Sequence, residues 1–487
     1  MIKILFVVNK YVTCQAGQKF YPCFLKHLVS SLKEKNIELK YVFFGGDLEN
    51  SFLTSDDFFY ERSIASVDKV DLEKEANRIE NAYGFTFKQA YYPEMLQASD
   101  FTVRNNGRAI HLPEDVISDL GHLVDRFNYV ENIILNENID VVISDQSTDA
   151  EIEFARAICL KNNKLFFRIW PDFLGKRSIH QEYEFCKDKA VEAVYDPDFS
   201  YEKAEAFLDD YLNNERSPYP PSVFYHEPSS FQTRLKRNFN IPSVVDFISG
   251  KRLYRVIRKI VTKLFYFVER LRKDILNSDY DATQNYFFWG FHLTTEATIS
   301  LRGLPYLTQT SLIESISRVL PYGYFLYVRE HPSWRNDFKL EHLKKLSELP
   351  NVRVISTSVP IHTILRNSKG VITYNATTGI EALMHGKPVL SFSPNMYYTL
   401  HPAADYCSDL YELGAKLVRL VNMNVEREDT ISYLQKMFQI TNDVPMEAET
   451  FFSKQDAVEK AEKLSRHLKE AFDMCLHHKD LSNGKEQ

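Results

Sequence analysis

Apolar residues along the first part of the chain fall into short runs, and amphipathic segments separate these runs. The runs predict buried strands at Ile2–Val8, 39–44, 139–144 and 164–170. Apolar residues at helical spacing predict helices between them, at 18–35, 114–136 and 149–162. Strand, helix and strand at this spacing are typical of βαβ units. The pattern therefore predicts a parallel sheet in the first part of the chain.

The same alternation returns after residue 286 and is clearer there. Buried strands are expected at 286–291, 324–329, 352–356, 370–374 and 388–392. Helices are expected between and after them, at 308–319, 337–348, 360–367, 378–385, 408–421 and 453–477. Regular alternation of this kind predicts a second doubly wound parallel sheet.

At 487 residues the chain exceeds the ~250–300 residues at which a single core stops growing, so we expect an α/β protein with more than one domain. The patterns predict two Rossmann-like domains facing a cleft, with a helical insertion between them. The predicted divisions are an N-terminal domain at 1–195, a basic insertion at 196–280 and a C-terminal domain at 281–440. C-terminal helices at 441–477 and a flexible tail at 478–487 follow.

The insertion contains a strongly basic segment at 251–273. Its apolar residues recur at helical spacing, and lysines and arginines occupy the other positions. Such a helix can pack against its own protein with a solvated basic face, or it can lie on an anionic membrane leaflet. Both alternatives stay open.

Composition narrows the class of protein. The formal net charge of -7 argues against a nucleic-acid-binding protein. The six cysteines are scattered, without the spacing of a metal or redox motif, which indicates a reduced compartment. The apolar N-terminus is too short for a signal peptide, and no apolar run reaches the ~18 residues of a spanning helix. We therefore expect a cytoplasmic protein whose membrane contact, if any, is at the inner surface.

The segment 371–392 carries the strongest chemical signal. A buried strand ends at Asn375, Thr377, Thr378 and Gly379 follow, and a helix with Glu381 in its first turn begins. Ligands of open α/β sheets bind outside the carboxyl ends of the strands, and helix N-termini attract phosphate. The alternative is that a threonine merely caps the helix and Glu381 completes a capping box.

A second polar group follows the strand predicted at 324–329. Arg329, Glu330 and His331 stand at the strand end, and the following proline favours an extended backbone at His331. A histidine held there can bind a phosphate or a ribose, or donate a proton. A structural role for the histidine is the alternative.

A third group stands at the start of the second domain, where His292, Glu296 and Arg302 follow the first strand. These side chains suit acid/base catalysis or stabilisation of a departing phosphate. The alternative is a network of salt bridges at a hinge. In the first domain, Asp145 follows a predicted strand and is the candidate base for an acceptor hydroxyl.

These motifs together resemble a known family. The segments Arg329-Glu-His-Pro, Asn351-Val-Arg-Val-Ile and Asn375-Ala-Thr-Thr-Gly-Ile-Glu-Ala resemble bacterial capsule and surface polysaccharide biosynthesis proteins. That family includes the capsule Kdo transferase-like enzymes of the GT-B fold. Thr295 stands where the family usually has a proline. The resemblance implies that His331 contacts the nucleotide and that Thr377–Gly379 hold its phosphate.

The resemblance and the residues together predict a metal-independent glycosyltransferase. It would need no cofactor besides its co-substrate, a CMP- or UDP-linked sugar, and would extend a glycan or a lipid-linked acceptor. Three alternatives stay open: a glycerophosphate-type polymer transferase, a sugar-nucleotide epimerase of the same fold, and a non-catalytic scaffold for glycan assembly.

Overall fold

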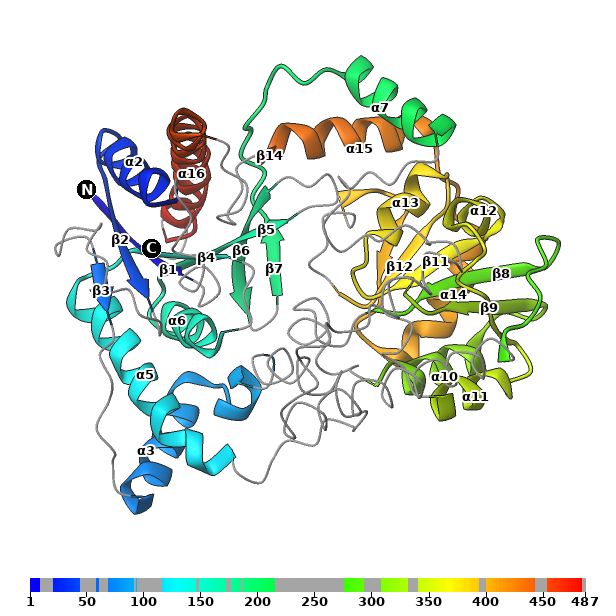
Figure 1. Cartoon of the computed structure of the whole chain (residues 1–487), viewed down its shortest axis with the longest axis horizontal. Helices are drawn as coiled ribbons and strands as arrows, with labels where there is room; N and C mark the ends of the chain where they lie inside the picture. The colour runs from blue at the N-terminus through cyan, green and yellow to red at the C-terminus, as the bar shows by residue number, and fades with distance from the viewer. Residues whose placement is uncertain are drawn as a thin grey trace, which may run out of the picture.

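The computed structural model (Figure 1) describes the chain in segments. The described residues are 1–8, 21–43, 58–60, 69–91, 93, 116–145, 149–171, 177–184, 187–214, 276–292, 308–331, 340–393, 400–442 and 453–483. Within them the chain forms two sheets, each covered by helices on both faces (Figure 1).

The first sheet has a parallel part built from the N-terminal strands. These strands are β1 (Ile2–Val8), β2 (Ile37–Phe43), β3 (Phe58–Tyr60), β4 (Val141–Asp145) and β5 (Leu165–Pro171). Their order is β3-β2-β1-β4-β5, so the chain reverses its direction of winding between β1 and β4. Three strands continue the sheet beyond β5 in antiparallel pairing: β6 (Arg177–Glu184), β7 (Lys187–Ala190) and β14 (Thr441–Asn442).

Two cores sandwich this sheet. One contains α2 (Tyr21–Lys33) and the C-terminal helix α16 (Lys454–Asn483), which lie side by side (Figure 1). The other contains α3 (Lys69–Tyr83), α5 (Val116–Asn136) and α6 (Ala150–Lys161). The C-terminal helix α16 thus packs against the N-terminal helix α2 and stabilises it. The sequence pattern did not predict this contact.

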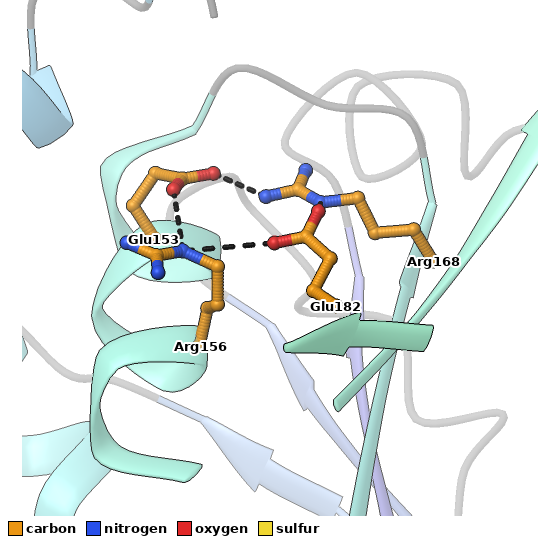
Figure 2. A network of polar contacts seen from close by, with 4 residues as sticks. All are labelled: Glu153, Arg156, Arg168 and Glu182. Carbon is orange, nitrogen blue, oxygen red and sulfur yellow. Dashed lines mark hydrogen bonds and ion pairs between the residues drawn. The ribbon is translucent and has the colours of Figure 1, made fainter. Parts of the chain in front are cut away.

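Helix α6 is buried at every position from Ala150 to Cys159, although it carries several charges. Figure 2 shows how two of them, Glu153 and Arg156, meet Arg168 of β5 and Glu182 of β6. The Arg156 Nε lies 2.9 Å from Glu153 Oε2 and 3.6 Å from Glu182 Oε2. Arg168 is paired with both carboxylates. All four side chains are at most 4% exposed, so each charge depends on its partners.

The second sheet is wholly parallel. Its strands are β8 (Asn285–Gly290), β9 (Tyr324–Arg329), β10 (Val352–Val354), β11 (Gly370–Thr373), β12 (Val389–Ser391) and β13 (Ala404–Tyr406). Their order is β10-β9-β8-β11-β12-β13, which corresponds to 3-2-1-4-5-6, the strand order of the Rossmann fold. The winding reverses between β8 and β11, and such a reversal is where α/β sheets bind ligands.

Helices again cover both faces. One core contains α12 (Ile361–Asn367), α13 (Thr378–Met384), α15 (Arg427–Ile440) and α7 (Tyr201–Asn214). The other contains α10 (Gln309–Val319), α11 (Leu340–Ser347) and α14 (Leu413–Val421), and the short 3-10 helix η6 (Leu410–Glu412) precedes α14. Because Ala204, Leu208 and Tyr211 of α7 belong to this core, the beginning of the predicted insertion packs on the second sheet.

Two chain segments pass between the sheets next to one another. The N–H groups of Tyr195 and Asp196 both donate to the carbonyl oxygen of Gln439, at 2.6 and 3.0 Å. Phe199 and Phe438 stack with ring centroids 4.2 Å apart. The segment entering the second half and the segment leaving it are therefore tied together at one place.

The α/β class with two Rossmann-like, GT-B-like halves is confirmed by these sheets. The helix predicted at 378–385 ends as expected: Gly386 has φ +67°, and the N–H groups of Gly386 and Lys387 donate to the carbonyl oxygens of Leu383 and Ala382. Helix α16 continues to Asn483, past the predicted end at 477 and into the predicted tail. The exact domain boundaries stay a prediction.

The basic segment 251–273 lies outside the described residues, so both of its predicted roles stay predictions. Within the part of the chain that the structure describes, no helix is long and apolar enough to cross a membrane.

Candidate functional site

His292 follows β8 at the point where the winding of the second sheet reverses. Its side chain is buried, and its Nε2 lies 3.0 Å from the hydroxyl oxygen of Thr373, the last residue of β11. Its backbone is held by Gln309, which accepts from the His292 N–H at 3.0 Å and donates to the His292 carbonyl at 2.8 Å. The imidazole is thus fixed between the ends of β8 and β11.

The environment of His292 keeps the imidazole uncharged. Burial, with a contribution from the nearby His331, lowers the pKa of His292 to about 3. Its ring packs edge to face against Trp289 and Tyr374, with ring centroids 5.7 and 5.2 Å away. At neutral pH it can therefore donate or accept a hydrogen bond, but it cannot supply a positive charge.

The end of β9 supplies the positive charge instead. Arg329 donates from Nη1 to the carbonyl of Val359 at 2.8 Å, and its guanidinium lies over the ring of Phe288, 5.7 Å from the centroid. Glu330 is buried beside it. Burial and the charge of Arg329 lower the pKa of His331 to about 4, so His331 is also neutral at neutral pH.

The loop after β11 approaches β8 from the other side. A methyl group at Gly290 would lie 3.9 Å from the Thr378 hydroxyl, so the beginning of α13 stands against the end of β8. The Ala376 N–H donates to the Thr373 hydroxyl oxygen at 3.2 Å, which fixes the entry to this loop. Thr377 occupies the N-cap position of α13 and makes no side-chain cap hydrogen bond. The simple capping role for Thr377 therefore finds no support in the geometry.

Glu381 stands on the first turn of α13 and is half-buried. Burial raises its pKa to about 7, and the guanidinium of Arg329 offsets part of that increase. A carboxyl group that titrates near neutrality beside an arginine is characteristic of a functional site.

Several buried polar atoms at these strand ends have no hydrogen-bond partner among the residues that the structure describes. They are Trp289 Nε1, His292 Nδ1, Asn375 Oδ1 and Ser393 Oγ, which lie on or just after β8, β11 and β12. Leaving a buried donor or acceptor unpaired costs about 1–3 kcal/mol. Donors and acceptors of this kind at the reversal of winding can form hydrogen bonds with a polar ligand.

The structure thus brings most of the predicted second-domain residues to the same edge of the sheet. They are His292, Arg329, Glu330, His331, Asn375, Thr377, Thr378, Gly379 and Glu381. Glu296 and Arg302 lie outside the described residues. Asp145 ends β4 in the other sheet, beside the reversal between β1 and β4, and only its backbone is described. The functional role of each residue stays a prediction.

The sequence analysis did not single out Gln309, Thr373, Trp289 or Ser393. Thr373 and Ser393 stand at or just beyond the ends of β11 and β12, so the rule that strand ends face the ligand already applied to them. Gln309 carried no such signal, because its contact with His292 depends on how α10 packs.

Together these residues can bind a polar, anionic group. Arg329 offers a charge, the hydroxyls of Thr377 and Thr378 offer hydrogen bonds, and neutral imidazoles offer directed donors. A phosphate-bearing ligand has the chemistry that such a set recognises.

Residues 305–400 match the family described as "Capsule polysaccharide biosynthesis protein". This match confirms, over that part of the chain, the resemblance inferred from the sequence motifs. The matched residues include Arg329, His331, Asn375 and Glu381.

Among solved structures, the chain is similar to the UDP-GlcNAc 2-epimerase from Methanocaldococcus jannaschii, at 10% identity, with 90% and 98% of the two chains covered and a TM-score of 0.26. It is also similar to the glycosyltransferase SnogD from Streptomyces nogalater, at 12% identity, with 95% and 99% covered and a TM-score of 0.25. For the spinosyn rhamnosyltransferase SpnG, the identity is 11%, the coverage 91% and 98%, and the TM-score 0.26. A search of curated proteins finds no match.

Proposed function

We propose that the chain is a glycosyltransferase that moves a sugar from a nucleotide-sugar donor to a surface or capsular polysaccharide acceptor. The observation that carries the proposal is the convergence of His292, Arg329 and Glu381 at the reversal of winding in the second sheet. The family match over residues 305–400 supports the same assignment.

In this proposal the nucleotide sugar binds at the carboxyl ends of β8, β9 and β11. Thr377, Thr378 and Gly379 contact its phosphate, because they stand where α13 begins beside β8. Arg329 supplies the positive charge that stabilises the departing phosphate, a role that another enzyme can give to a metal ion. His331 contacts the nucleotide from the end of β9.

Glu381 acts close to Arg329, and its raised pKa lets it stay protonated beside an anionic ligand. A protonated carboxyl group donates a hydrogen bond, whereas a carboxylate would repel the phosphate. Asn375 adds a buried amide oxygen that can accept from a ligand hydroxyl.

The acceptor is proposed to bind against the first sheet, where Asp145 ends β4 and would accept the proton of the attacking hydroxyl. Glu296 and Arg302 are proposed to complete the site after His292. The donor is proposed to be CMP- or UDP-linked. A lipid-linked acceptor at the inner membrane surface would give the segment 251–273 its role.

Nucleotide binding is the first test. Thermal unfolding is measured with CMP, UDP, GDP and CDP, and with CMP- and UDP-sugars. A ligand at about a hundred times its Kd stabilises the folded state by about 2.7 kcal/mol. The correct nucleotide should raise the melting temperature of the wild type and of Arg318→Met, but not of Arg329→Met. Arg318 is the matched control because it is 75% exposed on α10.

Transfer is the second test, with the stabilising nucleotide sugar incubated with and without a glycan acceptor. Release of nucleotide and extension of the glycan only with acceptor supports the proposal. Conversion of the sugar nucleotide without acceptor would identify an epimerase instead, and turnover of a CDP-linked polyol would identify a polymer transferase. If no nucleotide stabilises the wild type, the assignment of this site is wrong.

A further inference from the structure

The hydroxyl of Thr373 connects two parts of the proposed site. Its oxygen accepts from the Ala376 N–H at 3.2 Å, at the entry to the loop before α13. The same oxygen lies 3.0 Å from His292 Nε2. Thr373 is 1% exposed, so water cannot readily replace either contact. One hydroxyl group therefore links the phosphate loop to the imidazole.

The positions of the hydrogen atoms on Thr373 and His292 follow from a count of their donors and acceptors. A neutral imidazole carries one proton, and a hydroxyl group has one hydrogen to donate. If Nε2 carried the ring proton, it would donate to Thr373, and the Thr373 hydrogen would need another acceptor. Nδ1 would then be a buried acceptor with no donor. Two polar groups would be unsatisfied.

The opposite assignment leaves fewer groups unsatisfied. Thr373 then accepts from Ala376 and donates its hydrogen to His292 Nε2, so the ring proton is on Nδ1. Of the polar groups of Thr373 and the His292 ring, the Nδ1–H is then the one without a partner among the described residues, and a ligand can satisfy it. Since every unsatisfied buried group destabilises the folded protein, the tautomer that leaves fewer of them is favoured.

The backbone of His292 supports the same arrangement. Gln309 holds both the N–H and the carbonyl of His292, and Trp289 and Tyr374 pack against the ring. The imidazole is therefore restrained in position as well as in tautomer. Trp289 Nε1, a group that can only donate, is also buried and unpaired in this aromatic cluster. The unpaired nitrogen of Trp289 and the Nδ1–H of His292 would thus both be hydrogen-bond donors.

We propose that Thr373 is a positioning residue that holds His292 in the neutral tautomer with the proton on Nδ1. His292 then presents a fixed N–H donor to an oxygen atom of the bound phosphate, and it does not act as a base. No proton is transferred to or from the ring in this role. The proposal rests on the proposed function for the identity of the ligand, but the tautomer can be tested without it.

The tautomer is read from the ring nitrogens by long-range proton–nitrogen NMR of the wild-type protein labelled with ¹⁵N-histidine. The signals of His292 are assigned by their loss in His292→Asn. We expect a protonated Nδ1 and an unprotonated Nε2. Thr373→Ser should keep this pattern, and Thr373→Val should lose it, because the hydroxyl hydrogen is gone. A protonated Nε2 in the wild type would overturn the proposal, whether or not the variants fold.

Substitutions at His292 test the role in the reaction. An asparagine amide reaches the position of Nδ1, whereas a glutamine amide reaches that of Nε2. With the nucleotide sugar found above, His292→Asn should retain activity within about tenfold, and His292→Gln should lose 10²–10³-fold, the usual loss for a removed donor of this kind. Thr373→Val should lower kcat more than it raises KM, and Thr373→Ser should restore kcat. Equal activity of the two His292 variants would contradict a directed Nδ1 donor.

The two proposals fail in different ways. If the wild type shows a protonated Nδ1 but turns over no nucleotide sugar, the positioning role of Thr373 stands and the proposed function is wrong. If sugar is transferred but Nε2 carries the proton, the function stands and the positioning role is wrong.

Discussion

In the first sheet, buried Glu153 and Arg168 face opposite charges, whereas at the end of the second sheet buried His292 and Asn375 each keep a polar atom without a partner. Both places lie near the carboxyl ends of parallel strands, at similar depth. Burial by itself lowers the pKa of the Arg168 guanidinium, but the carboxylates of Glu182 and Glu153 outweigh it and raise that pKa above its ordinary value. Around His292 burial prevails: it lowers the pKa, and the hydrogen bond with Gln309 offsets only part of that decrease.

The difference separates polar groups that maintain the fold from polar groups that we propose bind a ligand. A paired network is satisfied without any other molecule, so its loss should destabilise the protein. An unpaired group contributes nothing favourable to folding, so its removal should affect binding and not stability. Four substitutions test this separation, in order of their expected effect on the free energy of unfolding.

Arg168→Met should disrupt the buried network of paired charges most severely. The change leaves the buried carboxylates of Glu153 and Glu182 with one arginine between them. We expect a loss of about 3–5 kcal/mol in unfolding free energy, measured by urea denaturation. Arg318→Met, at an exposed position, should change it by less than about 0.5 kcal/mol. A loss below 1 kcal/mol for Arg168→Met would show that the network is not needed for the fold.

Glu381 should destabilise the protein in a pH-dependent way. Its pKa is about 7 in the folded state and 4.5 as the ordinary value, so the folded state holds the proton more tightly. Stability should therefore fall as the pH rises from about 4.5 to about 7, by on the order of 2–3 kcal/mol.

The matched variants are Glu381→Gln and Glu348→Gln, the latter at an exposed position in the same half. Urea denaturation at pH 5 should give Glu381→Gln the stability of the wild type, and at pH 8 a higher stability. Glu348→Gln should follow the wild type at both pH values. Parallel curves for Glu381→Gln and the wild type would show that Glu381 is not buried as the structure has it.

Asn375→Leu removes a buried amide oxygen that has no partner among the described residues, and it keeps the approximate volume of the side chain. The unfolding free energy should stay equal or rise by up to about 1 kcal/mol, because an unsatisfied buried oxygen is lost. Affinity for the nucleotide identified by thermal unfolding should fall by about tenfold, measured by calorimetry. A clear loss of stability with unchanged affinity would show that Asn375 supports the fold and does not bind the nucleotide.

The smallest effect is expected for Arg427→Ala, which removes an exposed ion pair between α15 and α7. Arg427 lies 2.7 Å from Asp209, and both side chains are well exposed. Urea denaturation should show a change within about 0.5 kcal/mol, because water screens the pair. A larger loss would mean that this pair, and not the apolar contacts of Leu208 and Tyr211, attaches α7 to the second core.

Much of the second half could be predicted from the sequence, because its strands are short apolar runs between amphipathic helices. The strand predicted at 324–329 has those bounds, and the helix predicted at 378–385 is observed at Thr378–Met384. The rule that strand ends face the ligand identified His292 and Asn375. Helix α15 and strand β13 were not predicted; β13 is a half-buried edge strand of three residues without an apolar run.

The contacts that fix the site were not predictable in the same way. Gln309 and Thr373 act on His292 across 17 and 81 residues of sequence. Their residue types are common at buried positions and carry no periodic signal. The burial of the charged residues of α6 could not be predicted either. A pattern of charged residues indicates a solvated helix face unless the partners on β5 and β6 are known.

The sequence by itself determined the alternation of strands and helices that forms the central parallel part of each sheet, because periodicity and strand length are local properties that each segment carries alone; the short edge strands β3 and β13 and the antiparallel strands β6, β7 and β14 were not predicted. Only the tertiary structure decided which polar groups are paired, where the C-terminal helix α16 returns, and which nitrogen of His292 meets Thr373. The physical reason is that pairing and burial depend on groups brought together from distant parts of the chain, and the stabilisation that they give exists only when the chain has closed around them.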